Sequence, residues 1–423
     1  MARRRDILKM ATAGSAALIL PRFTAKARNM TPSDHPLESM IADITPITVA
    51  ERQARIDKAR RLMAGNNIDA LILEPGTAML YFTGIRWWRS ERLTAVVIPQ
   101  KGEIAVVTPY FEEPSVRESL SFGDDVRTWN EHENPFERLA GILADRGLSG
   151  GRIGVEETVR YFVIDGLHAA APAFETVSAT PVTLGCRMYK SAHEIALMKR
   201  ASDITIAAYR HTARRLEAGM TPADIARIMH EATVALGGES QFELVLMGEA
   251  SAYPHGSRSP QVLRQGEVVL MDCGCAVEGY QSDISRSFVF GQASPHQRQV
   301  WNTVHAGQQL AFKSAKIGLP AGSLDDTVRG FYESKGYGPG YRTPGLSHRL
   351  GHGIGMDGHE RVNLVHGETT PLAPGMCFSN EPGIYSFGQF GIRLEDCFYM
   401  TDDGPRWFSE PAPSLDDPFG LKS

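Results

Sequence analysis

Helical patterns and short apolar runs alternate along the chain between residues 47 and 185. The helical spacing of apolar positions is clear in ERQARIDKARRLMAGNN (51–67) and in FERLAGILADRG (136–147). Strands that alternate with helices predict an α/β domain. None of these helices is opened by a glycine-rich phosphate loop, so the pattern does not indicate a nucleotide site. The predicted strands are DALILEP (69–75), LTAVVIP (93–99), EIAVVTP (103–109) and GRIGVE (151–156).

A different order of elements begins near residue 190. Ser191 and Glu194 form a capping box, which predicts a long amphipathic helix that runs to about Leu216. Thr221, followed by proline, opens a second helix. A pair of strands then follows, because two apolar runs are separated by a glycine-containing turn. These runs are GEVVLMDCG (266–274) and SDISRSFVFG (282–291), with the turn near Glu278-Gly279.

The same order of two helices and a strand pair then recurs. One helix is opened by Ser294-Pro295, and we expect the next to be capped by Ser323 with Asp326 three residues later. The halves share no sequence identity that would prove a duplication, so the recurrence is only a hint of architecture. The late strands are MCFSNEPGIY (376–385) and GIRLEDCFYM (391–400).

The length of the chain supports this division into two domains. Its charge argues against nucleic acid as a partner. The chain has 423 residues, of which 42% are hydrophobic, and this is too long for one ordinary domain. Its net charge of -5, with no basic block beyond the first residues, gives no electrostatic footprint for nucleic acid.

The first residues have the pattern of an export signal. Arginines precede an apolar run, residues 10–20, that is too short to span a bilayer. Arg4-Arg5, followed by Ile-Leu-Lys at positions 7–9, resembles the twin-arginine translocation pattern, and Ala25-Lys26-Ala27 offers a cleavage site. We therefore expect residues 1–27 to be a signal peptide and the mature protein to be periplasmic or secreted, without stable membrane association. The alternative is a disordered basic tail.

The five cysteines do not suggest a disulfide framework, although export would expose the chain to an oxidising compartment. Their number is odd, and no C-x-x-C pair is present. Cys273 and Cys275 lie two apart on a predicted strand, where adjacent positions rarely have disulfide geometry. We expect small buried side chains at both positions.

Four carboxylates on or beside apolar strands need a partner. Asp272 ends one predicted strand and Asp283 begins the next, while Glu381 and Glu395 lie on later ones. Burial of an ionised carboxylate is costly unless a proton, a base or a cation neutralises it. With His352 added, the set offers oxygen-rich ligation for two divalent ions, whose four positive charges balance four negative ones. Each residue alone also fits an ordinary role, as a turn, a cap or a core histidine.

The spacing of these residues resembles that of the pita-bread metallopeptidases, in the branch of Xaa-Pro aminopeptidases and Xaa-Pro dipeptidases (prolidases). MDCGCAVEGYQSDISRSF (271–288) carries paired aspartates eleven positions apart, and GHGIGMDGHE (351–360), NEPGIY (380–385) and RLED (393–396) follow in the family's order. Tyr81-Phe82-Thr83-Gly84 lies where the family's creatinase-type N-terminal domain has this motif. Ser285 stands where the family commonly has threonine and keeps a hydroxyl.

The resemblance implies a fold and a set of roles. The fold is an α/β creatinase-like N-terminal domain, residues 45–186, followed by an α+β pita-bread catalytic domain, residues 190–415. The implied metal ligands are Asp272, Asp283, His352, Glu381 and Glu395. The implied catalytic residues are His255, His348, His359, Glu381 and Arg393.

Each catalytic residue has its own implied role. His255 stabilises the tetrahedral intermediate, His359 contacts substrate and helps with proton transfer, and His348 is a further pocket histidine of the proline-specific branch. Glu381, besides being a ligand, accepts the proton of the attacking water. Arg393 orients the carboxylates, unless it forms only a surface ion pair.

The resemblance predicts an X-Pro peptidase, either an aminopeptidase or a dipeptidase. We expect two divalent ions, with Mn²⁺ favoured by the oxygen-rich ligands and Zn²⁺ or Co²⁺ as alternatives. The expected partners are a small peptide with proline at its second position and a second copy of the chain. A hydrolase or lyase of a small non-peptide metabolite would keep the same metal site, and a binding protein would use the cleft without chemistry. Trp87 and Trp88 are expected in the core or an interface, rather than in a pocket.

Overall fold

The computed structural model describes residues 37–421, so the predicted signal peptide lies outside the described residues. The first domain contains a six-stranded sheet in the order β4-β3-β2-β1-β5-β6. β1 is antiparallel to β2 and parallel to β5, so the sheet is mixed. Its strands are β1 (Ala70–Leu73), β2 (Ala95–Pro99), β3 (Ala105–Pro109), β4 (Val126–Trp129), β5 (Gly151–Val155) and β6 (Phe174–Ser178).

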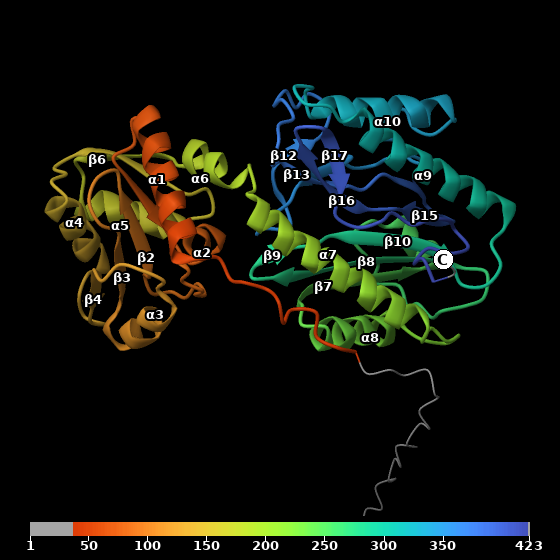
Figure 1. The fold of residues 1–423 in the computed structure, drawn as a ribbon, viewed down its shortest axis with the longest axis horizontal. Coiled ribbons are helices and arrows are strands. Elements are labelled where there is room, and N and C mark those ends of the chain that lie inside the picture. Colours follow the sequence, from red (N-terminus) through yellow and green to blue (C-terminus); the bar gives the residue numbers. More distant parts are fainter. Residues whose placement is uncertain (1–36, 422–423) are drawn as a thin grey trace, which may run out of the picture. The chain divides into compact units, whose positions relative to one another are not determined.

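Helices cover this sheet because one face of each is apolar. Leu139 and Leu143 of α4 and Leu167 of α5 pack in one core with Ile72 and Val97 of the sheet. The alternation of strands and helices predicted an α/β domain here, and this prediction is confirmed (Figure 1). The helices are α1 (Val49–Gly65), α2 (Thr77–Thr83), α3 (Glu113–Ser119), α4 (Pro135–Asp145), α5 (Tyr161–Ala170) and α6 (Thr180–Arg187), with a 3₁₀ turn η1 (Tyr110–Glu112).

The second domain begins with two helices on a sheet. α7 (Ala192–Ala213) and α8 (Pro222–Ala235) lie against the sheet formed by β7 (Glu239–Met247), β8 (Val268–Val277) and β10 (Ile284–Val289) (Figure 1). Both helices start at capping boxes: Ser191 caps α7 and Thr221 caps α8. α7 ends at Ala213, three residues before the predicted end. β9 (Tyr280–Gln281) pairs with the end of β8, and the 3₁₀ turn η2 (Gly248–Ala252) follows β7.

The strand pair differs from the sequence prediction in two respects. β8 continues for five residues beyond Asp272, so this aspartate lies in the middle of the strand and not at its end. β7 was not predicted, and it pairs with β8 on the side opposite to β10. β8 is therefore the central strand of the sheet, which explains why it tolerates apolar residues on both faces.

The second half of this domain repeats the order of helices and strands. α9 (Pro295–Ser314) starts at the predicted cap, Ser294. α10 (Gly322–Ser334) starts one residue before Ser323, so the predicted cap is wrong: the Ser323 hydroxyl donates to the Pro320 carbonyl at 2.6 Å. The remaining strands are β11 (Gly351–Gly353), β12 (Glu360–Leu364), β13 (Cys377–Asn380), β14 (Gly383–Ser386), β15 (Phe390–Arg393), β16 (Asp396–Thr401) and β17 (Gly404–Trp407).

Two sheets are made by these late strands. Five form the order β12-β11-β13-β16-β17, and β14 pairs with β15 as a hairpin. Glu381 lies between β13 and β14, and Glu395 lies between β15 and β16. Both glutamates are thus at strand junctions and not within strands as predicted. At such junctions the hydrogen bonding between strands is interrupted, so the side chain can point toward the inside of the domain.

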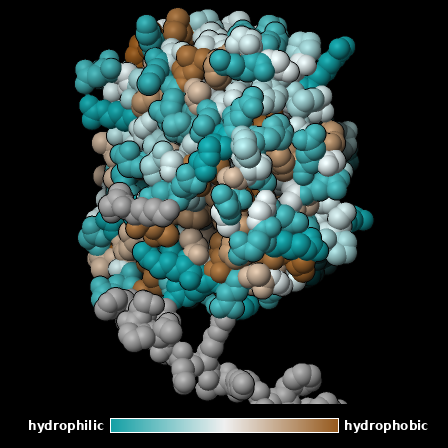
Figure 2. Space-filling model, turned by 90° about the vertical axis from the view of Figure 1, so that its right-hand side faces the viewer, coloured by the Kyte–Doolittle hydropathy of each residue, from teal (hydrophilic) through white to brown (hydrophobic). Residues whose placement is uncertain are grey.

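The described surface mixes hydrophobic and hydrophilic side chains. On the face drawn in Figure 2, hydrophobic residues form small groups among hydrophilic ones. No helix within residues 37–421 combines the length and the apolar character that a membrane span requires. The five cysteines are buried and free, as expected. Trp87 and Trp88 stack with ring centroids 4.7 Å apart, and because Trp88 is 66% exposed it does not belong to the core.

Candidate metal centre

A cavity of about 810 Å³ in the second domain brings together all nine residues that the sequence singled out. They come from the central sheet, the late strands and three loops. Their convergence from segments over 130 positions apart is a property of the fold, which the sequence order alone does not contain. The nine residues are His255, Asp272, Asp283, His348, His352, His359, Glu381, Arg393 and Glu395.

The two aspartates reach the cavity from β8 and from the residue just before its neighbour β10. Asp272 lies directly opposite Ser285 in the antiparallel register, and Asp283 immediately precedes β10. Asp272, Asp283 and Glu395 can each offer an oxygen such that all three atoms lie within 4.8 Å of one another. A carboxylate cluster of this size matches the donor set of a divalent cation site.

His352 is fixed by the close approach of three strands. A Cβ atom on Gly351 would lie 2.1 Å from the Ser379 carbonyl oxygen of β13, and one on Gly353 would lie 2.8 Å from the Arg361 carbonyl oxygen of β12. Only glycine fits at these two positions, which explains the pattern Gly-His-Gly. The histidine between them is 1% exposed and cannot turn away from the cavity.

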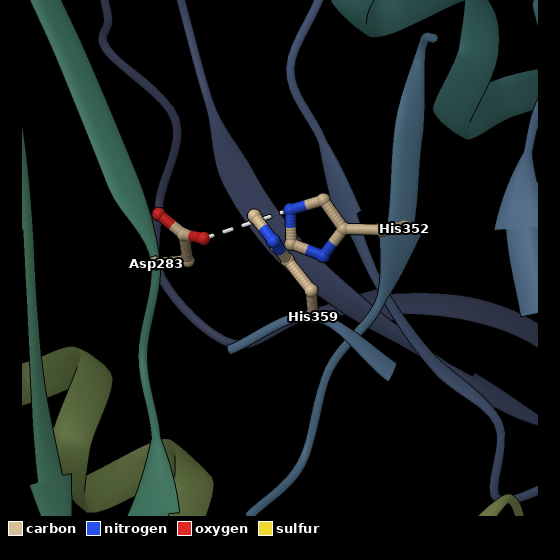
Figure 3. Close-up of side chains that lie close together, drawn as sticks. All are labelled: Asp283, His352 and His359. Carbon is tan, nitrogen blue, oxygen red and sulfur yellow. Dashed lines mark ion pairs between the residues drawn. The ribbon is translucent and has the colours of Figure 1, made fainter. Parts of the chain in front are cut away.

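The hydrogen bonds of His352 select its tautomer. Nδ1 donates to the Gly353 carbonyl at 3.0 Å, which leaves the Nε2 lone pair free. Nε2 lies 3.4 Å from a Glu381 oxygen and 3.7 Å from an Asp283 oxygen. Figure 3 shows His352 of β11 and Asp283, which immediately precedes β10, reaching toward each other, with the His359 ring beside them. This is the geometry of a neutral imidazole prepared to bind a metal ion.

The electrostatics of the carboxylates are unfavourable without a cation. Burial, together with the charges of Asp272 and Glu381, raises the pKa of Asp283 well above its usual value. Burial and the charge of Asp283 do the same to the pKa of Glu395. Burial raises the pKa of Glu381 to about 7, although Arg393 opposes the rise. The described residues therefore supply too little positive charge for this group of acids.

A second observation tests whether a metal fits. Oδ1 of Asp272 is buried and accepts no hydrogen bond from the described residues, whereas its Oδ2 accepts one from Nη2 of Arg393 at 2.6 Å. A buried carboxylate oxygen without a donor is costly. The chemistry of the donor set and this free oxygen both fit divalent cations.

Arg393 is buried and organises the carboxylates, so the alternative of a surface ion pair is wrong: its side chain is 2% exposed. Its Nε donates to the Ser285 hydroxyl at 2.9 Å, and this hydroxyl donates to Glu395 at 2.7 Å. Its Nη2 holds Asp272. One guanidinium therefore orients a carboxylate of β8 and one at the junction of β15 and β16, and the hydroxyl of Ser285 is part of the connection.

The three other histidines differ in their hydrogen-bond partners and in their exposure to the cavity. Nδ1 of His348 donates to the Arg349 carbonyl at 2.7 Å, and its Nε2 accepts from the Tyr385 hydroxyl at 2.8 Å. Burial lowers the pKa of His348 to about 3, so it is neutral at physiological pH. Because both ring nitrogens of His348 have partners, this histidine is suited to hold the pocket in shape. His255 and His359 are exposed to the cavity and suit contact with a substrate.

Five cavity residues were not predicted. Phe242 and Leu244 of β7 form an apolar wall, and they were missed because β7 itself was missed. Arg349 adds a cation, and its place beside His348 in the sequence was a signal that could have identified it. Gln281 and Gly358 complete the lining.

Both domains and the cavity together define a metal-dependent enzyme, and comparisons with known proteins identify its class. The family model for metallopeptidase family M24 matches residues 196–402. The family model for the creatinase/prolidase N-terminal domain matches residues 55–189. The chain belongs to metallopeptidase family M24.

Individual relatives match this chain over nearly their whole length. The chain is 30% identical to the Xaa-Pro dipeptidase of Lactobacillus helveticus, over 85% of this chain and 98% of that protein. Dipeptidase PepE from Mycobacterium ulcerans has a similar structure, with a TM-score of 0.81, 30% identity and coverage of 88% of this chain and 99% of the other. Prolidase from Thermococcus sibiricus gives a TM-score of 0.79 at 27% identity, with coverage of 85% and 97%.

Proposed function

We propose that this chain hydrolyses the bond between an N-terminal residue and a proline in the second position of a small peptide, using two divalent metal ions. The observation that carries the proposal is a group of four carboxylates, of which Asp283 and Glu395 are buried and Asp272 and Glu381 partly buried, together with one neutral histidine and a free Asp272 oxygen. Similarity to an Xaa-Pro dipeptidase and to a prolidase supports the same reaction.

The ligands would be Asp272, Asp283, His352, Glu381 and Glu395, whose four negative charges two divalent ions would balance. Their oxygen-rich donor set favours Mn²⁺, with Zn²⁺ and Co²⁺ as alternatives. When bound, such ions lower the pKa of water and polarise the carbonyl of a substrate.

The chain's own residues would move protons and hold the substrate. Glu381, with a pKa near 7 in the absence of metal, can take up the proton of the attacking water on a carboxylate oxygen and deliver it to the proline nitrogen. His255 and His359, both open to the cavity, would donate hydrogen bonds to the amide oxygen as it gains charge. Arg393 would keep the carboxylates in position.

Selectivity for proline would come from shape. An X-Pro bond has no amide N–H, so a peptidase cannot recognise it by that donor. Phe242 and Leu244 offer an apolar wall on which a ring can pack. Replacing proline with alanine in the substrate should then reduce kcat/KM by roughly tenfold to two-hundredfold.

We further propose that dipeptides are preferred over longer peptides, because of Arg349. This side chain lines the cavity and makes no hydrogen bond or ion pair with a carboxylate among residues 37–421. An unpaired guanidinium in a cavity is suited to bind the C-terminal carboxylate of a dipeptide. Arg349→Met should raise KM for Ala-Pro while leaving KM for Ala-Pro amide unchanged. Arg342→Met, at an exposed position outside the cavity, is the matched control.

A peptide panel tests the reaction itself. With Mn²⁺ added, Ala-Pro should be cleaved faster than Arg-Pro-Pro and much faster than Ala-Ala, and N-acetyl-Ala-Pro should be the poorest substrate because it lacks the free amine. Equal cleavage of the acetylated and free peptides would contradict the proposal. Hydrolysis of none of these peptides would favour the alternative, a hydrolase or lyase of a small metabolite, for which creatine is one probe.

We also propose export by the twin-arginine route and assembly as a homodimer. Export rests on the sequence of residues 1–27. Exposed aromatic side chains of the first domain, Trp88, Tyr110 and Phe111, would suit an interface with a second copy. Sedimentation of the wild type and of Trp88→Ser tests the dimer, which the substitution should weaken.

A further inference from the structure

His359 has no side-chain anchor of its own. Its ring makes no hydrogen bond with the residues that the structure describes, and its contact is an edge-to-face one with His352 at a centroid distance of 4.2 Å. It is also exposed to the cavity. The backbone of the preceding segment, residues 354–358, therefore determines where this imidazole lies.

That segment is held by the residue after His359. Glu360 is buried, with a side-chain exposure of 5%. Its Oε1 accepts the backbone N–H groups of Met356 at 3.1 Å and of Asp357 at 3.3 Å. The Glu360 carboxylate thus fixes the backbone of the loop at Met356 and Asp357. His359 lies between this loop and Glu360 in the chain.

Two basic residues at the connection between the domains fix Glu360 in turn. Nη2 of Arg187, at the end of α6, donates to its Oε1 at 2.5 Å, and Nζ of Lys190 donates to its Oε2 at 2.7 Å. Arg187 also pairs with Asp357 at 2.5 Å. Burial alone raises the pKa of Glu360, but the charges of Lys190 and Arg187 outweigh it and hold the pKa at about 2.

The other side of the loop is equally constrained. Nε2 of Gln281 donates to the Met356 carbonyl at 2.8 Å, and its backbone N–H donates to the Gly355 carbonyl at 2.8 Å. A Cβ on Gly355 would lie 2.7 Å from Cε of Lys190, so the loop packs directly on this lysine. The Thr77 hydroxyl of α2, in the first domain, donates to Asp357.

We propose that Arg187, Lys190 and Glu360 are positioning residues that act through His359, and that the first domain thereby sets the efficiency of the catalytic step in the second. The inference rests on the proposed function, in which His359 contacts the substrate. Misplacement of a reacting group by about 1 Å can reduce a rate by around a hundredfold, so a loop that carries such a group must be fixed.

A double-mutant cycle distinguishes positioning from general stability. Arg187→Met should lower kcat at least tenfold in the wild type, with a change in KM of less than about threefold, and Arg187→Lys should restore part of the loss. In a His359→Ala background the same Arg187→Met change should cost less than about threefold, because the group that it positions is gone.

Arg55→Met is the matched control. Arg55 forms a similarly buried pair with Glu194 at 3.1 Å and also donates to the Tyr280 hydroxyl and the Tyr81 carbonyl, and none of these hydrogen bonds goes to residues 354–358. Its effect on kcat should be equal in both backgrounds. If Arg187→Met lowers kcat by the same factor with and without His359, or does not lower it at all, the positioning role is wrong.

Hydrogen exchange gives a readout that needs no turnover. The amides of Met356 and Asp357 should exchange faster in Arg187→Met and at the wild-type rate in Arg55→Met. Unchanged exchange in Arg187→Met overturns the inference. If the wild type cleaves no X-Pro peptide, the proposed function fails, and the exchange result still decides whether this cluster holds the loop.

Discussion

In the metal-free protein, the carboxylates of the metal centre should make folding stability fall as pH rises. Burial raises the pKa of Glu381 from its ordinary 4.5 to about 7. Between these values the folded protein keeps a proton that the unfolded chain has lost. The stabilisation is therefore complete below pH 4.5 and is lost as pH rises through 7.

The size of the effect follows from the two pKa values. The difference corresponds to about 3 kcal/mol of unfolding free energy for Glu381. Asp283 and Glu395, whose pKa values are also raised by burial and by neighbouring charge, change stability in the same direction. Glu381→Gln places a neutral side chain of the same size at the site and should remove most of the pH dependence due to this residue.

Urea unfolding in excess chelator at pH 5, 6, 7 and 8 measures the effect. Relative to pH 5, where part of the effect is already lost, the wild type should lose roughly 2 to 3 kcal/mol more than Glu381→Gln by pH 8. Glu118→Gln, at an exposed position of α3, is the control and should follow the wild type. If the difference between wild type and Glu381→Gln is the same at all four pH values, Glu381 is not held in a protonated state and the reasoning fails.

Three further changes test single parts of the account. Asp283→Asn should bind less metal per chain, measured by elemental analysis, and full occupancy with full activity would count against the ligand set. His255→Ala and His359→Ala should keep their metal but lose around a hundredfold in turnover, whereas loss of metal with unchanged turnover per bound ion would reassign them as ligands. Replacing both Arg4 and Arg5 with lysine should retain the protein in the cytoplasm, and unchanged recovery from the periplasm would exclude the twin-arginine route.

The sequence predicted the chemistry better than the exact elements that carry it. The four carboxylates stood out because buried charge needs compensation, and the resemblance of the motifs to a known family singled out His352. The structure places these five in one cavity, while their roles as ligands remain predictions. The α/β type of the first domain followed from the alternation of strands and helices, which is a local signal in the sequence, whereas the α+β type of the second was implied by the resemblance.

Other features depend on contacts that local patterns do not encode. The strand β7 was missed, because ESQFELVLM contains polar residues in its first half and becomes recognisable only beside β8. Its side chains Phe242 and Leu244 were therefore missing from the predicted pocket. The cap at Ser323 was wrong, because its hydroxyl bonds backward to Pro320. The buried ion pair between Glu360 and Arg187 could not be predicted either, since the two residues are 173 positions apart in the chain.

Metal titration of the metal-free enzyme, with activity and bound metal followed together, tests the central claim most directly. Mn²⁺ should be added in steps to chelator-treated protein, and Ala-Pro hydrolysis should be measured at each step. We predict no hydrolysis without metal, and full hydrolysis when about two ions are bound per chain, in line with the charge of the four carboxylates. Full activity in the metal-free protein, or no hydrolysis of Ala-Pro at any metal loading, would contradict the assignment of this cavity as the metal centre of an X-Pro peptidase.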